Sequence, residues 1–174
     1  MDNIILALRY GGVFALLAAA VVQDLRSRQI KNALCLIGVA LGLALALLDP
    51  NTAITDWLFG LLLAFATGFL LWMLGMFCAG DAKLLCAIGA CWGAEAFANC
   101  FVCTVLVGGV FSLLYMIIKG ELKIRLRNVF NYFKGMITTM SFKKYSPPAE
   151  LDNALPFSIF ILLGAAASLA VNII

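Results

Sequence analysis

Long apolar runs separated by short charged stretches dominate the pattern of hydrophobic and polar positions. The uncharged runs cover residues 10–23, 32–48, 57–80, 84–94, 96–118 and 153–174. A helix needs about 20 mostly apolar residues to cross about 30 Å of hydrocarbon, and most of these runs approach or reach that length. The pattern therefore predicts an all-α, polytopic membrane protein with about six transmembrane helices.

The run at 84–94 is the shortest of the six. At a rise of about 1.5 Å per residue it extends only about 17 Å, which is too short to span the bilayer. We therefore expect the fourth helix to include Asp81 to Phe97, with its charged ends at or slightly inside the interface. Asp81 then lies close to the membrane boundary, where it meets both water and a membrane-embedded substrate.

Basic residues occur in alternate loops. They are Arg26, Arg28 and Lys31 after the first run, Lys83 after the third, and seven residues between 119 and 144. Because cytoplasmic loops carry an excess of Lys and Arg, this distribution predicts a multi-pass protein of the cytoplasmic membrane with these loops inside and both termini outside. Arg9 is the exception, and its long side chain reaches the headgroups from the outer end of the first segment.

Residues 121–144 have a different pattern, in which apolar side chains recur every three or four positions and basic or polar side chains lie between them. This spacing predicts an amphipathic helix between the fifth and sixth crossings. Its basic face favours the cytoplasmic leaflet and anionic lipid headgroups. Pro147 and Pro148 end the helix. Neither a repeat nor a second soluble domain is visible, so residues 1–174 are predicted to form a single membrane-embedded domain.

Composition agrees with a membrane protein. Hydrophobic residues make up 64% and charged residues 12% of the chain, and the mean hydropathy is +1.06, which leaves too little polar surface for a soluble globule. A basic region, short apolar core and cleavage site are missing at the N-terminus, so we expect the first apolar run to stay in the mature chain. We expect no nucleic-acid partner.

The residue inventory limits the chemistry. The chain has no histidine, which excludes a Ser-His protease, a histidine-ligated zinc protease and a histidine proton relay. Of the six cysteines, only Cys100 and Cys103 form a C-x-x-C, and no second pair completes a structural zinc site. We therefore predict no metal and no cofactor, and interpret the cysteines as small packing residues.

Two aspartates remain as candidate catalytic residues. Asp24 ends the first apolar run and Asp81 begins the fourth helix, so both lie at the cytoplasmic boundary of antiparallel segments. Two carboxyl groups within a few ångströms share one proton. The ionised group then takes a proton from water while the protonated group donates to the scissile carbonyl, which is general acid-base hydrolysis. Gly80 would let a substrate backbone approach.

Other interpretations of these aspartates stay open. Asp81 also fits a helix cap, Lys83 a positive-inside anchor, and Asp24 an ion pair with Arg26 or Arg28. Paired acids also fit a small proton- or cation-coupled transporter, although both acids cluster at one face and inverted repeats are missing. A non-catalytic assembly component is a third interpretation.

Three patches resemble the type IV prepilin peptidase family. "CAGDAK" (78–83) is similar to its G-x-G-D-x-K signature, and "DLRSRQIKN" (24–32) to its second motif, an Asp followed by a basic stretch and I-P-N. "LPFSIFILLGA" (155–165) resembles its last segment, in which Pro-Phe opens the final helix. The patches occur in the expected order and cover essentially the whole chain.

The resemblance implies a membrane aspartic endopeptidase that removes the basic leader from prepilins on the cytoplasmic side. Asp24 and Asp81 would be its catalytic pair, with Gly80 and Lys83 in supporting positions, Lys83 helping to keep one aspartate ionised. Nothing matches the paired-cysteine loop of larger members, so peptidase activity without methyltransferase activity is implied, as in the short enzymes of Flp or Tad pilus systems. In presenilin-like proteases a tyrosine precedes the first aspartate, where this chain has Gln23.

Two positions depart from the family motifs. Cys78 replaces the first glycine of the signature, and Lys31 replaces the proline before Asn32. The first change affects backbone freedom beside the predicted site, and the second affects the loop. Neither change removes a carboxyl group.

Overall fold

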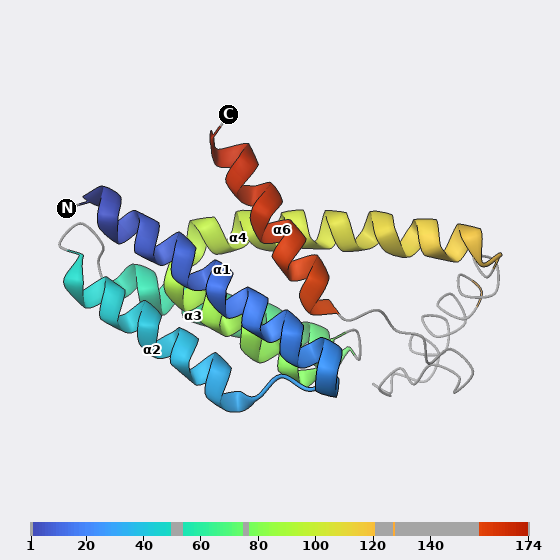
Figure 1. Ribbon diagram of the computed structural model, residues 1–174, viewed down its shortest axis with the longest axis horizontal. Helices are drawn as coiled ribbons and strands as arrows, with labels where there is room; N and C mark the ends of the chain where they lie inside the picture. Colours follow the sequence, from blue (N-terminus) through green and yellow to red (C-terminus); the bar gives the residue numbers. More distant parts are fainter. Residues whose placement is uncertain (1, 50–53, 75–76, 121–126, 128–156, 174) are drawn as a thin grey trace, which may run out of the picture.

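The computed structural model describes residues 2–49, 54–74, 77–120, 127 and 157–173, and these residues form helices and short connections without a strand. The helices are α1 (Asp2–Ser27), α2 (Asn32–Leu48), α3 (Ile54–Met73), α4 (Ala79–Ile118) and α6 (Phe157–Ile173) (Figure 1). The prediction of an all-α protein is confirmed. Apart from Arg127, the predicted amphipathic helix at 121–144 lies outside the described residues.

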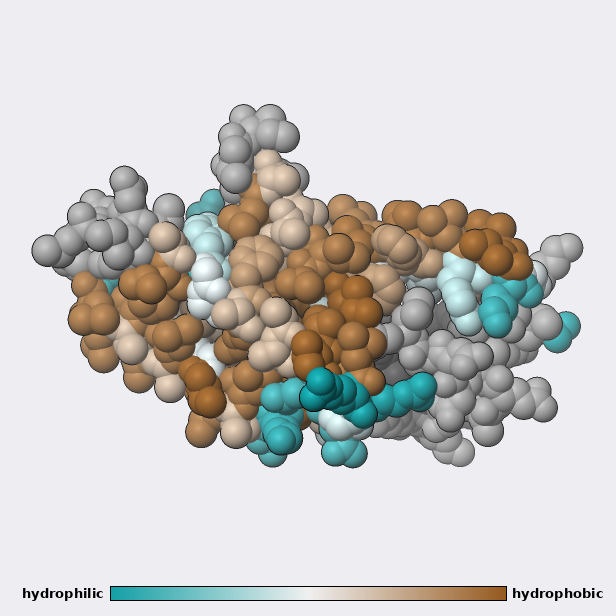
Figure 2. All heavy atoms as spheres, in the orientation of Figure 1, coloured by the Kyte–Doolittle hydropathy of each residue, from teal (hydrophilic) through white to brown (hydrophobic). Residues whose placement is uncertain are grey.

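Three of the described helices are long and apolar enough to cross a membrane: the Ala7–Ser27 part of α1, α3 and α4. The helices α2 and α6 are apolar but shorter. Hydrophobic side chains cover most of the visible surface of the helical body, and hydrophilic residues gather along its lower edge (Figure 2). Because this outer surface suits lipid, the chain is a multi-pass membrane protein. The number of six crossings stays a prediction.

Neighbouring segments run in opposite directions. On α1 and α2, a side chain added at Gly12 would meet Leu41, whereas one added at Gly38 would meet Leu16. This reversed order of contacts makes the two helices antiparallel. The loop of residues 28–31 joins them, and Arg28 adopts a left-handed φ of 50° directly after the last turn of α1. A left-handed residue at this position is a common way to end a helix.

The helix α4 contains a break at Gly93, where φ is 79° and ψ is −179°. Glycine tolerates this backbone conformation far better than other residues do. In addition, a side chain at this position would collide with the carboxyl group of Asp56. The Asp56 Oδ1 atom accepts a hydrogen bond of 3.4 Å from the Ala94 N–H, just after the break. Asp56 and Gly93 therefore define the point at which the chain turns.

The chain changes direction at this break. The ring of Phe77, just before α4, lies 4.4 Å from that of Phe157, and a side chain added at Gly108 would lie 3.7 Å from Phe157. Phe157 thus lies close both to the start of α4 and to Gly108, so residues 94–108 run back toward the end of the bundle at which α4 begins. The fourth helix is expected from the sequence to include Asp81 to Phe97, and α4 does begin before Asp81, at Ala79. It breaks at Gly93, before Phe97, and the apolar pattern gives no sign of this bend.

The segment 79–92 is the buried centre of the bundle. Leu84, Leu85, Ala87 and Ile88 are each no more than 1% exposed. The glycines of two neighbouring helices lie against this segment: Gly38 and Gly42 of α2, and Gly60 and Gly68 of α3. Small residues let helix backbones approach closely, which promotes helix association in a membrane, where lipid is as apolar as the side chains.

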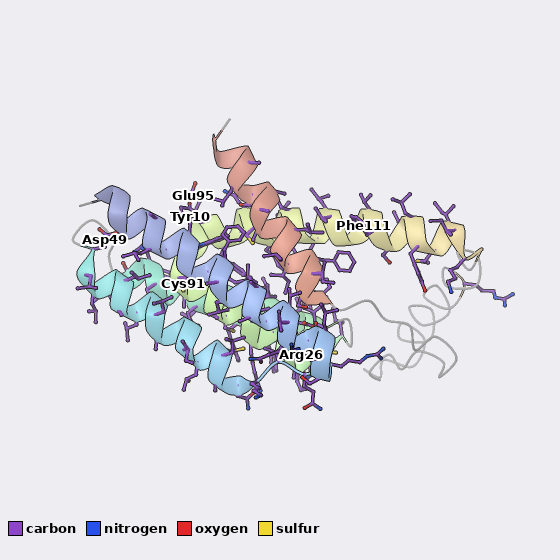
Figure 3. The ribbon with its side chains drawn as sticks, in the orientation of Figure 1. Tyr10, Arg26, Asp49, Cys91, Glu95 and Phe111 are labelled. Carbon is purple, nitrogen blue, oxygen red and sulfur yellow. The ribbon has the colours of Figure 1, made fainter. Side chains whose placement is uncertain are left out.

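Polar and aromatic contacts also occur at the other end of the bundle, away from Asp24. Arg9 forms an ion pair of 3.5 Å with Asp49 at the end of α2, and the ring of Tyr10 lies 5.3 Å from that of Trp92. Figure 3 labels Tyr10, Asp49 and Glu95 at this end and Arg26 at the other. Arg9, the exception to the charge pattern, thus has an acidic partner on the neighbouring helix.

Replacing Gly42 with Ala tests the close approach of α2 to α4. A Cβ atom there would lie 2.5 Å from the carbonyl oxygen of Ala90 and 2.9 Å from the nitrogen of Cys91, so backbone must shift. We expect a loss of about 1–3 kcal/mol in the free energy of unfolding, as for other overpacked interiors. Reversible unfolding in mild detergent measures this loss.

The matched control is Gly109→Ala, because nothing lies within 4 Å of a side chain added there. That variant should keep or slightly raise stability, since alanine is the better helix former. Equal effects of the two substitutions would contradict the packing that we describe.

Candidate active site

Asp24 lies in the last turns of α1, and Asp81 lies in the first turn of α4. A Cβ atom added at Gly80, next to Asp81, would lie 3.4 Å from Ile30 in the loop that follows α1, so the structure brings the two predicted residues to the same end of the bundle. The two aspartates are 57 positions apart in sequence. They lie at the same end because the chain turns after α1, runs away along α2 and comes back along α3 to the start of α4.

Asp81 is the more enclosed of the two aspartates, with 7% of its surface exposed, whereas Asp24 is partly buried. The Oδ2 atom of Asp81 accepts a hydrogen bond of 3.2 Å from the backbone N–H of Cys78. This contact is the returning half of a capping box, in which the side chain at the third helical position bonds the capping residue. Asp81 therefore does take part in capping the helix, but as the third helical residue, with Cys78 and not Asp81 in the N-cap position.

Asp24 is held by a residue that the sequence did not single out. The Ser158 hydroxyl, in the first turn of α6, donates a hydrogen bond of 2.6 Å to the Oδ2 atom of Asp24. Ser158 is fully buried. The only signal in the sequence is that Ser158 is a polar side chain in an otherwise apolar first turn. Arg26 and Arg28 were considered as ion-pair partners of Asp24, but the only ion pair among the described residues joins Arg9 and Asp49.

Lys83 connects the two motif patches. Its Nζ atom donates a hydrogen bond of 2.8 Å to the Oδ1 atom of Asn32, the first residue of α2. The lysine was expected to support the charge of an aspartate, yet its observed bond is to a neutral amide. In the described part of the chain Lys83 therefore fixes the start of α2 to the start of α4. Its electrostatic role stays a prediction.

Gly80 packs against the loop between α1 and α2. A Cβ atom added at Gly80 would lie 3.4 Å from Cβ of Ile30, so the space beside this glycine is taken by the other motif patch. The loop is further fixed by Gln23, whose Oε1 atom accepts a hydrogen bond of 3.1 Å from the Lys31 N–H. The role of Gly80 toward a substrate backbone stays a prediction.

The two departures from the family motifs keep ordinary backbone conformations. Cys78, at the start of α4, has φ −77° and ψ 155°, which any residue adopts, so a glycine is not required. Lys31 has φ −66° and ψ 134°, close to the φ of about −65° that proline imposes. The φ angle at Lys31 would therefore also suit a proline, but a proline has no N–H to donate to Gln23.

Among the described residues, neither the cysteines nor the other residue types that can bind metals form a second candidate site. Cys35, Cys91 and Cys100 are buried in the hydrophobic core, as their interpretation as packing residues predicts. In the described part of the chain no group of three or more His, Cys, Asp or Glu side chains is placed to hold a metal ion. The paired carboxyl groups are thus the candidate centre for chemistry.

An all-helical membrane bundle with two partly or fully buried carboxyl groups at one end is the arrangement of a class of membrane protein to which intramembrane proteases belong. A profile of the type IV leader peptidase family matches residues 12–113, which is more than half of the chain and contains Asp24 and Asp81. The chain belongs to this peptidase family. Comparisons with curated proteins and with solved structures find no match.

A double-mutant cycle tests the bond between Lys83 and Asn32. Lys83→Met and Asn32→Ala should each lower the free energy of unfolding, and the double variant should lose less than the sum of the two. The expected coupling is about 0.5–1.5 kcal/mol, which is typical of a single hydrogen bond. Unfolding of the four purified proteins in the same detergent measures it, and additive losses would show that the two side chains act independently.

Proposed function

We propose that this chain is an aspartic endopeptidase that removes the short basic leader from Flp-like type IV prepilins at the cytoplasmic face of the cell membrane. The observation that carries the proposal is that Asp24 and Asp81 lie at one end of the bundle, inside the part of the chain that matches the family. The bond between Lys83 and Asn32 supports it, because it joins the two motif patches that contain these acids.

The proposed mechanism is general acid-base hydrolysis. Two carboxyl groups at close range share one proton, since both cannot ionise cheaply. The ionised group removes a proton from the attacking water, and the protonated group donates to the carbonyl oxygen of the scissile peptide. The chain contains no histidine, which a Ser-His protease or a histidine-ligated zinc protease needs for this step. The proposal is limited to peptide-bond hydrolysis, without methyl transfer to the new N-terminus.

The proposed orientation of the chain in the membrane places its basic loops on the cytoplasmic side. The alternating directions of α1, α2, α3, the two parts of α4, and α6 support six crossings. Both labelled termini lie on the side away from the end of α1 in Figure 1, which agrees with both termini outside. In this arrangement residues 121–144 would lie on the inner leaflet and contact anionic headgroups.

Substitution of either aspartate should abolish processing. Co-expression with a Flp-type prepilin, followed by a gel-shift assay at matched membrane levels, compares wild type with Asp24→Asn and Asp81→Asn. Because general acid-base catalysis contributes about 10²–10⁴-fold, we expect each variant to lose at least about 100-fold in cleavage rate. Asparagine keeps the size of the side chain but removes its acid-base function.

The control for this experiment is Glu95→Gln, which removes an exposed carboxyl group at the opposite end of the bundle (Figure 3). It should process the precursor like wild type. Processing that survives in both aspartate variants would refute the peptidase mechanism. Ion-dependent uptake into vesicles that both aspartate variants lose would instead favour the transporter.

Reporter fusions test the proposed orientation. A reporter active only outside the cytoplasm should be active when fused after residue 174 and inactive when fused within residues 121–144, because the basic loop is retained inside. The reciprocal reporter, active only in the cytoplasm, should give the opposite pattern. Equal activity of one reporter at both positions would rule out this topology.

A further inference from the structure

The first turn of α6 contacts both halves of the candidate active site. Ser158 donates its hydrogen bond to Asp24, and Phe157 packs its ring against Phe77 at a centroid distance of 4.4 Å. Phe77 immediately precedes Cys78, whose N–H bonds Asp81. The start of α6 therefore lies where α1 ends and α4 begins. This helix is outside residues 12–113, the part of the chain that matches the family.

The bond made by Ser158 differs from those of other hydroxyl groups in the bundle. Thr67 and Thr104 donate to carbonyl oxygens four residues earlier in their own helices, which is the usual solution for a hydroxyl in an apolar helix. Ser158 instead bonds a carboxyl group 134 residues away. A hydrogen bond to a carboxylate is shorter and stronger than one between neutral groups, and its length of 2.6 Å fits that type.

The position of Ser158 is fixed by the packing of its helix. Side chains added at Gly164 would collide with Thr104, so α6 lies directly on the second part of α4. Ile161 and Ala165 are fully buried on the same helix. Because Ser158 itself has no exposed surface, its hydroxyl has little freedom to move with solvent. The serine is thus a rigid donor aimed at one oxygen of Asp24.

We propose that Ser158 is a positioning residue for catalysis: it holds Oδ2 of Asp24 and thereby directs Oδ1 toward the attacking water and the shared proton. This inference rests on the proposed peptidase function. Reacting groups must be held within a fraction of an ångström of their productive geometry, and a displacement of about 1 Å costs up to about 100-fold in rate. Removing the hydroxyl should therefore affect the chemical step more than substrate binding.

Cleavage kinetics with purified protein and a synthetic prepilin peptide test the positioning. Ser158→Ala should lower kcat about tenfold or more and leave KM within about twofold, since an interaction needed only in the transition state acts on kcat. Ser158→Thr, which keeps the hydroxyl, should recover most of the lost kcat. Ser168→Ala, which removes another buried serine of α6, should leave both constants unchanged.

Infrared spectroscopy tests the contact without relying on activity. The carboxyl band that disappears in Asp24→Asn should shift in Ser158→Ala and stay in place in Ser168→Ala. An unshifted band would overturn the inference. So would a kcat of Ser158→Ala equal to that of Ser168→Ala in a preparation where wild type cleaves the peptide.

The two proposals fail in distinguishable ways. If wild type does not cleave, while authentic processing by a known prepilin peptidase succeeds with the same peptide, the proposed function is wrong and the catalytic role of Ser158 fails with it. If wild type cleaves and Asp24→Asn does not, the proposed function stands. In that case the Ser158 variants alone decide the inference.

Discussion

The close approach of helix backbones to the segment 79–92 determines the rest of the structure. Lipid is as apolar as the side chains, so moving a side chain from lipid into a helix interface gains little free energy. Helices in a membrane therefore associate through contacts between small residues and through hydrogen bonds. Here Gly38 and Gly42 of α2, and Gly60 and Gly68 of α3, lie against this segment. Its first turn carries Asp81, so the same contacts that assemble the bundle also set the depth of the candidate active site.

The helices, and the location of Asp24 and Asp81 at one end of them, can be predicted from the sequence because both leave local signals. Uncharged runs mark the helices, and Asp24 and Asp81 stand out as the acids beside the basic loops. Their meeting follows from antiparallel neighbours of similar length. Helix ends are harder to predict, because the run at 57–80 continues through the end of α3 at Met73 and into the start of α4 at Ala79.

Contacts between distant segments leave no such signal. Ser158 lies 134 residues from Asp24, and nothing in a run of apolar residues indicates which helix its hydroxyl faces. The same applies to Lys83, for which the charge suggested an aspartate and the structure gives the amide of Asn32. The break at Gly93 depends on Asp56, whose Oδ1 atom accepts a hydrogen bond from Ala94, 38 residues away. Each of these features is a property of packing rather than of local pattern.

The break at Gly93 also has a consequence for how the chain sits in a membrane. Residues 79–92 form a helix only about 20 Å long, at a rise of about 1.5 Å per residue, whereas the hydrocarbon layer is about 30 Å thick. A helix of this length does not cross the layer by itself, and non-helical backbone at membrane depth is tolerated only where protein encloses it. Here Gly93 is buried, and α2 and α3 lie against the segment. The helix that carries Asp81 therefore depends on its neighbours for its place in the membrane, and the candidate site is complete only once the bundle has assembled.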